Sequence, residues 1–77
     1  MKVQIKKVGI KGDSFYLIEK VDEYYSLWVI EIVPDNLEEN TLQNFILAHN
    51  TEGYSTTGSY QQIIDICLEC GVELTDL

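Results

Sequence analysis

The segment YYSLWVIEIV, residues 24–33, is predicted to be a β-strand, and its pattern decides how the rest of the chain must fold. Alternate side chains of a strand face opposite sides of a sheet. One set here comprises Tyr24, Ser26, Trp28, Ile30 and Ile32, and the other comprises Tyr25, Leu27, Val29, Glu31 and Val33. Both sets are largely apolar, so we expect a central strand, a strand covered on both sides, or one that takes part in a subunit contact.

Two further strands are predicted before this segment. The apolar alternation of residues 2–10 changes phase at Lys6–Lys7, which predicts a β-bulge there or at Gly9. Residues 15–21, FYLIEKV, are rich in aromatic and β-branched side chains and form the second predicted strand. Short polar turns on either side of it connect the three strands into an antiparallel meander.

A helix is predicted after Pro34, whose missing N–H group ends the sheet. Asp35 or Asn36 can cap this helix. Apolar side chains then recur at helical spacing, so the helix is expected to run from about residue 36 to residue 49.

A second helix is predicted between Ser59 and Gly71. Ser59 and Gln62 have the spacing of a capping box, and Gly71 fits the position just after the last helical residue. The segment between the helices, YSTTGS at residues 54–59, is predicted to be a polar loop. Residues 72–77 are expected to form a short edge strand or a frayed end.

The order of the elements predicts a single α+β domain spanning residues 1–77. We expect a three-stranded antiparallel β-meander followed by two α-helices packed on one face. Placing both helices on one face is the economical way to bury their two apolar stripes. A chain of 77 residues leaves room for one domain only.

The charge distribution is the main anomaly of the sequence. The net charge is -8 and the pI is about 4.2, and Lys20 is the last positively charged residue in the chain. Average usage would place about six Lys or Arg in the remaining segment. Such an acidic chain repels nucleic acid and anionic membrane surfaces, so we expect it to bind neither directly.

Targeting signals are not apparent in the sequence. No apolar run approaches the roughly 18 residues that span a membrane, and the start of the chain lacks the apolar core of a signal peptide. The two cysteines lie only three residues apart, so they do not staple distant segments. We therefore expect a cytoplasmic protein.

Cys67 and Cys70 form a Cys-x-x-Cys pair near the end of the second predicted helix, and His49 is the one histidine. A zinc site needs four ligands, and reactive thiol pairs lie at helix N-termini rather than in the last turn. We expect Cys67 to be a core residue, Cys70 a helix-end packing residue and His49 a structural residue. We predict no catalytic residue, metal site or cofactor, with a metal- or redox-linked role for the two cysteines as an alternative.

Some acids lie where they oppose local stability. Asp65 and Glu69 are a like-charge pair one helical turn apart, and Glu69 lies at the negative end of its helix. Carboxylates about 6 Å apart can imitate successive phosphates of a nucleic acid. We therefore expect a non-enzymatic protein-binding module, an inhibitor that occupies the basic, nucleic-acid-binding surface of a partner protein. It is similar in size and charge, though in no sequence motif, to small acidic inhibitors encoded by phages and mobile elements.

The expected contact residues fall into two acidic groups, on the second and at the first helix. They are Asp65, Glu69 and Glu73, and then Asp35, Glu38 and Glu39. The lysines Lys2, Lys6, Lys7 and Lys11 are expected to form a separate basic edge that discourages aggregation.

Two alternatives to the inhibitor hypothesis remain open. In the first, the acidity only keeps a small protein soluble. In the second, the apolar strand at residues 24–33 makes a structural or assembly module, a possible homodimer. Its self-association residues would be Tyr25, Leu27, Trp28 and Val29.

Overall fold

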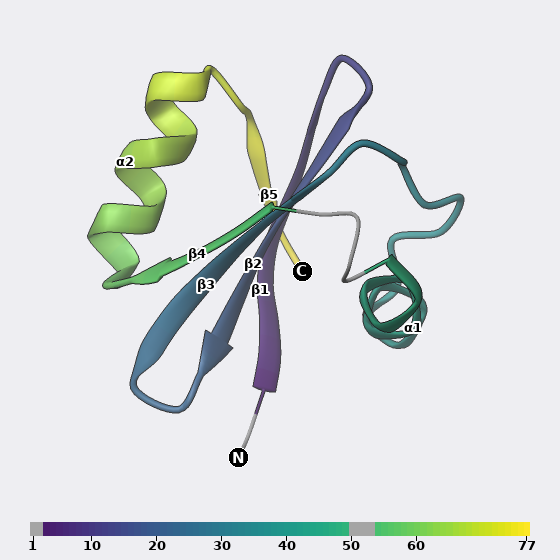
Figure 1. The fold of residues 1–77 in the computed structure, drawn as a ribbon, viewed down its shortest axis with the longest axis horizontal. Coiled ribbons are helices and arrows are strands. Elements are labelled where there is room, and N and C mark those ends of the chain that lie inside the picture. Colours follow the sequence, from purple (N-terminus) through teal and green to yellow (C-terminus); the bar gives the residue numbers. More distant parts are fainter. Residues whose placement is uncertain (1–2, 50–53) are drawn as a thin grey trace.

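Five antiparallel strands in one sheet and two helices make up the computed structural model, which describes residues 3–49 and 54–77 (Figure 1). In chain order the elements are β1 (Val3–Lys11), β2 (Ser14–Val21), β3 (Tyr24–Ile30), α1 (Glu39–His49), β4 (Tyr54–Gly58), α2 (Tyr60–Cys70) and β5 (Leu74–Asp76). The order across the sheet is β4-β3-β2-β1-β5. The α+β class is confirmed, but the sheet has five strands where three were expected.

The two additional strands form the edges of the sheet. β4 lies in the segment expected to be a polar loop and pairs with β3 from Val29 to Tyr25. Its Ser and Thr residues carry no apolar alternation, because an edge strand can leave its side chains in water while its backbone pairs on one side. β5 pairs with Lys7–Gly9 of β1, so the edge-strand alternative for residues 72–77 is the one observed.

The helices lie on opposite faces of the sheet, so the prediction that both pack on one face is wrong. Figure 1 views the sheet nearly edge-on, with α1 on one side and α2 on the other. α1 packs Leu42 and Ile46 into a core cluster that includes Phe15 and Leu17 of β2. α2 packs Ile63 and Cys67 into a second cluster, with Ile18 of β2 and Leu27 of β3.

Apolar side chains on both faces of β2 and β3 are the reason for this arrangement. Leu17 and Ile18 are neighbours in sequence, point to opposite faces and are both completely buried. A single helical layer would leave one of these faces in water. Of the alternatives for the predicted strand at residues 24–33, an interior strand covered on both sides is observed, because β3 pairs with β2 and β4 and contributes to both core clusters. β3 ends at Ile30 rather than at Val33.

A β-bulge in β1 keeps that strand apolar toward α1 along its length. The register with β2 shifts between Ile5 and Lys7, where the sequence predicted it. Ile5 lies opposite Glu19 and Val8 lies opposite Leu17, so Ile5 and Val8 share a face despite their odd spacing. Both are buried in the cluster under α1.

The boundaries of α2 follow its capping residues. Ser59 and Gln62 form the predicted capping box, in which Ser59 N–H donates to Gln62 Oε1 at 2.8 Å. Gly71 has a φ of 73° and donates its N–H to Leu68 O at 3.1 Å, which ends the helix as expected.

The first helix begins later than predicted. α1 starts at Glu39, and Asn36 Oδ1 instead accepts the N–H of Glu38 at 2.9 Å, in the turn that leads into the helix.

Gly9 lets the chain after α2 approach β1 closely. A Cβ atom at this position would lie 2.6 Å from Glu73 O and 2.7 Å from Val72 Cγ1. No Cβ tolerates such distances to a backbone atom, so any side chain here must displace the segment that leads into β5.

We predict that Gly9→Ala lowers the free energy of unfolding by about 1–3 kcal/mol. Amide hydrogen exchange should speed up in β5 more than in β2 and β3, because the clash is with the segment entering β5. Gly58→Ala is the matched control, since its Cβ would meet the side chain of Gln62 and would disturb the start of α2 rather than β5. Equal acceleration of hydrogen exchange in β5 by the two variants would contradict this explanation.

Candidate protein-binding surface

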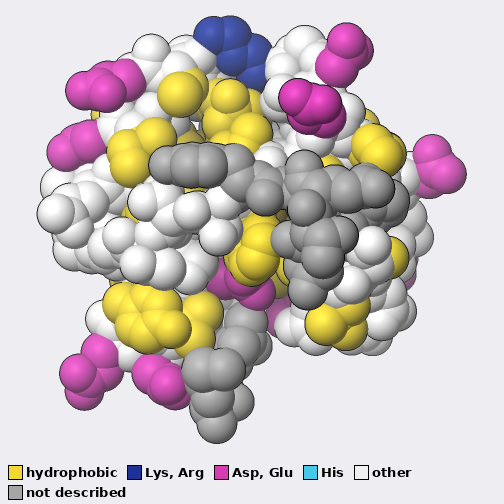
Figure 2. Space-filling model, in the orientation of Figure 1, with side chains coloured by type: hydrophobic (Ala, Val, Ile, Leu, Met, Phe, Trp, Pro, Cys, Tyr) yellow, Lys and Arg dark blue, Asp and Glu magenta, His cyan; other side chains and the backbone are white. Residues whose placement is uncertain are grey.

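Acidic side chains dominate the exposed charge of the molecule. Every Asp and Glu in the described ranges is exposed except Glu19. In Figure 2 the magenta acidic side chains lie at separate places around the outline of the face in view, and hydrophobic side chains are exposed between them. The acids on this face are therefore dispersed rather than gathered into one patch.

The α2 acidic group, defined as Asp65, Glu69 and Glu73, lies on the outer side of α2 and just beyond its end. All three residues are exposed, whereas Ile63 and Cys67 of the same helix face the sheet. Asp65 accepts a hydrogen bond from Gln61 Nε2 at 2.8 Å. Within the described ranges Glu69 and Glu73 make neither a hydrogen bond nor an ion pair, so their charges face water.

The α1 acidic group, defined as Asp35, Glu38 and Glu39, lies before and at the start of α1. These residues are also exposed. Because α1 and α2 cover opposite faces of the sheet, the two acidic groups belong to different sides of the molecule (Figure 1). Asp65 and Glu69 lie one helical turn apart on α2, whereas Glu73 lies beside β5 and lines a groove on each side of that strand.

Two lysines of β1, Lys7 and Lys11, contact the C-terminal part of the chain. They therefore do not form the separate basic edge that was expected. Lys7 Nζ forms a hydrogen-bonded ion pair with the Asp76 carboxylate, and this hydrogen bond raises the pKa of Lys7. Lys11 Nζ donates to Cys70 O, at the negative end of α2. The cation that α2 lacks in its own last turn is thus supplied by β1. Lys2 lies outside the described residues.

The residues proposed for self-association lie within the fold. Leu27 is completely buried, and Tyr25, Trp28 and Val29 are partly buried against the two core clusters. The Tyr25 ring also meets the Tyr60 ring edge-on, with centroids 5.0 Å apart. Since β3 is hydrogen-bonded on both sides, it offers no free edge to a second copy.

The Cys-x-x-Cys pair lies in the last turns of α2. Cys67 is buried, Cys70 is half-buried, and both are free thiols. Burial raises the pKa of Cys67, which disfavours the reactive thiolate. Among the described residues, no three His, Cys, Asp or Glu side chains come together as metal ligands. The His49 side chain lies outside what the structure describes.

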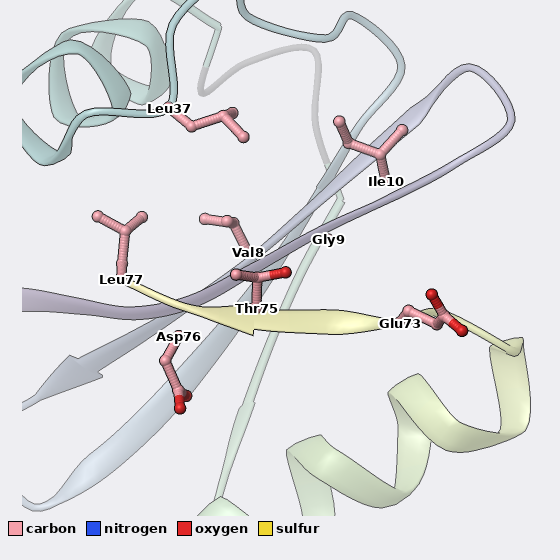
Figure 3. Close-up of a pocket in the computed structure, with 8 residues that line it drawn as sticks. All are labelled: Val8, Gly9, Ile10, Leu37, Glu73, Thr75, Asp76 and Leu77. Atoms are coloured by element: carbon pink, nitrogen blue, oxygen red, sulfur yellow. The ribbon is translucent and has the colours of Figure 1, made fainter.

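A groove beside β5 is the surface feature that the sequence did not reveal. This groove, the β5 groove, has a volume of about 420 Å³ (Figure 3). Its lining is Val8, Gly9, Ile10, Leu37, Glu73, Thr75, Asp76 and Leu77. Its apolar members come from β1, from the segment before α1 and from the end of the chain, and the β1–β5 pairing brings the first and last of these together.

A second groove lies on the other side of β5, against α2. This α2–β5 groove has a volume of about 450 Å³. It is lined by Ile64, Cys67, Leu68, Val72, Glu73, Leu74 and Thr75. Glu73 and Thr75 line both grooves, so the two openings flank the same short strand.

Glu19 is the one carboxylate of the described ranges that is buried. It is 8% exposed, and the indole Nε1–H of Trp28 donates a hydrogen bond to its Oε1. Burial raises the pKa of Glu19, and the Trp28 hydrogen bond opposes this effect. The sequence carried a signal for it, because Glu19 shares its face of β2 with Phe15, Leu17 and Val21.

These features define a small, acidic α+β domain with one central sheet, a helix on each face and an open edge flanked by two grooves. Comparison with protein-family models, with curated proteins and with solved structures finds no match to the chain. No described helix is long and apolar enough to cross a membrane.

We predict that Glu19→Gln raises the free energy of unfolding at pH 7 by about 1 kcal/mol, or about 4–8 °C in Tm. Gln keeps an acceptor for Trp28 Nε1–H but buries no charge. The folded-state pKa of Glu19 lies above its ordinary value of 4.5, so the wild-type protein loses stability as the pH rises between those two values. The gain should therefore vanish below about pH 4.

Thermal unfolding followed by circular dichroism at several pH values measures this gain. Glu23→Gln, at an exposed position in the β2–β3 turn, is the control and should leave Tm nearly unchanged at every pH. A pH-independent gain in Glu19→Gln would contradict the explanation from buried charge.

Proposed function

We propose that the chain is an acidic, non-enzymatic protein-binding module that occupies a basic surface of another protein. The observation that carries the proposal is the α2 acidic group, three exposed carboxylates on one side of the molecule. A fold this small supports a charged surface of fixed geometry, because α2 is anchored to the sheet through Ile63 and Cys67. Such a surface attracts a basic partner with fast, salt-sensitive association.

The basic surface that fits best is one that binds nucleic acid. Asp65 and Glu69 are one helical turn apart, about 6 Å, which is comparable to the spacing of phosphates along a strand. The α1 acidic group lies on the other side of the sheet, so the imitation is limited to the few phosphates that one helix can match. We propose that the module inhibits its partner by competition, in the manner of small acidic inhibitors of phages and mobile elements, and that it acts in the cytoplasm.

The Lys11 contact with Cys70 O supports this assignment of α2. It stabilises the negative end of the helix from another strand, so α2 needs no basic residue of its own in its last turn. The carboxylates that remain uncompensated by described groups are Glu69 and Glu73, the two nearest that end.

We predict that Asp65→Asn combined with Glu69→Gln weakens partner binding at least about tenfold and raises the free energy of unfolding by a few tenths of a kcal/mol. The double variant removes a like-charge pair while keeping an acceptor for Gln61 Nε2. Asp13→Asn combined with Glu23→Gln is the matched control. It removes two exposed carboxylates from turns elsewhere in the molecule, so its net charge equals that of the α2 double variant.

The measurement is a pull-down from nuclease-treated bacterial lysate with each protein as bait, with mass spectrometry of what is retained. The retained partner is then purified and its affinity is measured at low and high salt. A nucleic-acid-binding protein that DNA or RNA displaces, and that the control variant still binds, supports the proposal. Binding that is indifferent to salt, to nucleic acid and to the α2 variant would refute it.

A further inference from the structure

We propose that the open edge of β5 is a docking site for an extended, basic segment of a partner protein, which adds to the sheet as a sixth strand. This inference rests on the proposed function only for the sign of the partner's charge. Its geometry comes from β5 and the two grooves beside it, which share Glu73 with the α2 acidic group but include neither Asp65 nor Glu69.

The backbone of β5 is free on its outer side. β5 is the last strand of the sheet, and among the described residues no strand pairs with it beyond β1. Leu77 N–H donates to Lys6 O at 3.2 Å, so the backbone groups of Leu77 and Thr75 face β1. Because hydrogen-bonding directions alternate along a strand, the N–H and C=O groups of Leu74 and Asp76 point away from β1, toward the open edge.

The grooves are placed to receive the side chains of an added strand. Successive side chains of a strand point to opposite faces, and the β5 groove and the α2–β5 groove lie on the two sides of β5. Each groove contains exposed apolar side chains. Ile10 and Leu77, each 48% exposed, line the β5 groove, and Leu68, 68% exposed, lines the α2–β5 groove. A strand beside β5 could bury alternate apolar residues in each groove, which is how β-strand addition combines affinity with specificity.

The charge around the edge selects a basic occupant. Glu73 lies on both grooves, and no described lysine forms an ion pair with it, whereas Lys7 is paired with Asp76. A second copy of the chain would bring another net charge of -8 to the same edge, and this repulsion disfavours pairing between copies. Lys or Arg residues flanking apolar ones are therefore the chemistry that fits.

The opposite edge of the sheet does not share these properties. β4 is made of Tyr, Ser, Thr and Gly, and its described side chains include no exposed leucine or isoleucine. An added strand at β4 would gain backbone hydrogen bonds but no apolar contacts of the kind that flank β5.

The test uses a synthetic probe, the Lys–Val peptide, which is an acetylated and amidated nonapeptide with five central Val residues and two Lys residues at each end, so that Val side chains face both grooves. It is titrated into the ¹⁵N-labelled protein. We expect the amide resonances of Leu74 and Asp76 to shift and their hydrogen exchange to slow. A Glu–Val peptide of the same length should bind at least about tenfold more weakly because of its charge. A Lys–Val peptide with a central Pro should also bind at least about tenfold more weakly, because it lacks a ladder N–H group.

Two pairs of variants make the test specific to β5. Asp76→Pro removes an outward N–H group and should bind the Lys–Val peptide at least about tenfold more weakly than Asp76→Ala, because both variants lose the carboxylate and only Pro lacks the N–H group. Leu68→Ser should weaken binding about threefold or more, and Leu47→Ser, at a position 73% exposed on α1, should not change it. The leucine variants decide the matter if Asp76→Pro does not fold.

Several outcomes would overturn the inference. One is the absence of shifts in β5 with about 1 mM Lys–Val peptide. Another is equal binding of the Pro peptide. A third is a dimer in sedimentation equilibrium that Asp76→Pro dissolves, since the edge would then be occupied by a second copy. If the Lys–Val peptide does not bind but a partner from the lysate still requires Asp65 and Glu69, only the β5 site is refuted. If the peptide binds at β5 but the binding of the lysate partner does not depend on salt, only the role proposed for the α2 acidic group is refuted.

Discussion

The burial of both faces of β2 and β3 is the constraint on which the rest of the structure depends. Each of these strands buries apolar side chains on both sides of the sheet. In β2 these are Leu17 and Ile18, and in β3 they are Ile30 and Leu27. The described ranges contain two helices, and each face of the sheet receives one. α2 must then cross the sheet from β4 at one edge to β5 at the other, and this crossing places the short β5 strand beside β1.

The same constraint explains how the chain tolerates its acidity. Two one-helix layers leave the core clusters small and free of charged side chains, and Glu19 is the one buried carboxylate in the described ranges. The lysines are concentrated in β1 and β2, and the fold returns the C-terminal segment to them, so that Lys7 meets Asp76 and Lys11 meets Cys70 O. Charges that are far apart along the chain are therefore adjacent where the negative end of α2 needs them.

Local features of this fold could be predicted from sequence, because each depends on a few neighbouring residues. The bulge at Lys6, the capping box at Ser59 and the left-handed Gly71 are all of this kind. The position of the helices and the existence of β4 could not be predicted in the same way. Residues 54–58 have no apolar pattern and become a strand only because β3 would otherwise present an unpaired edge. For the candidate site, the α2 acidic group could be read from its helical spacing, whereas the grooves beside β5 require the β1–β5 pairing.

The anchoring of β5 links its stability to anything that pairs with its edge. Three residue pairs, the Lys7–Asp76 ion pair and the Leu77 hydrogen bond hold it to β1, and the close approach at Gly9 leaves no room for a side chain between them. An exposed ion pair contributes little free energy, so β5 belongs to the less stable part of the sheet. An occupant that pairs only with the folded strand stabilises it by mass action, and part of its binding free energy is spent on holding β5 in place. Affinity at this edge therefore depends on how well β1 holds β5, and Gly9 affects it by allowing the segment before β5 to pack closely on β1.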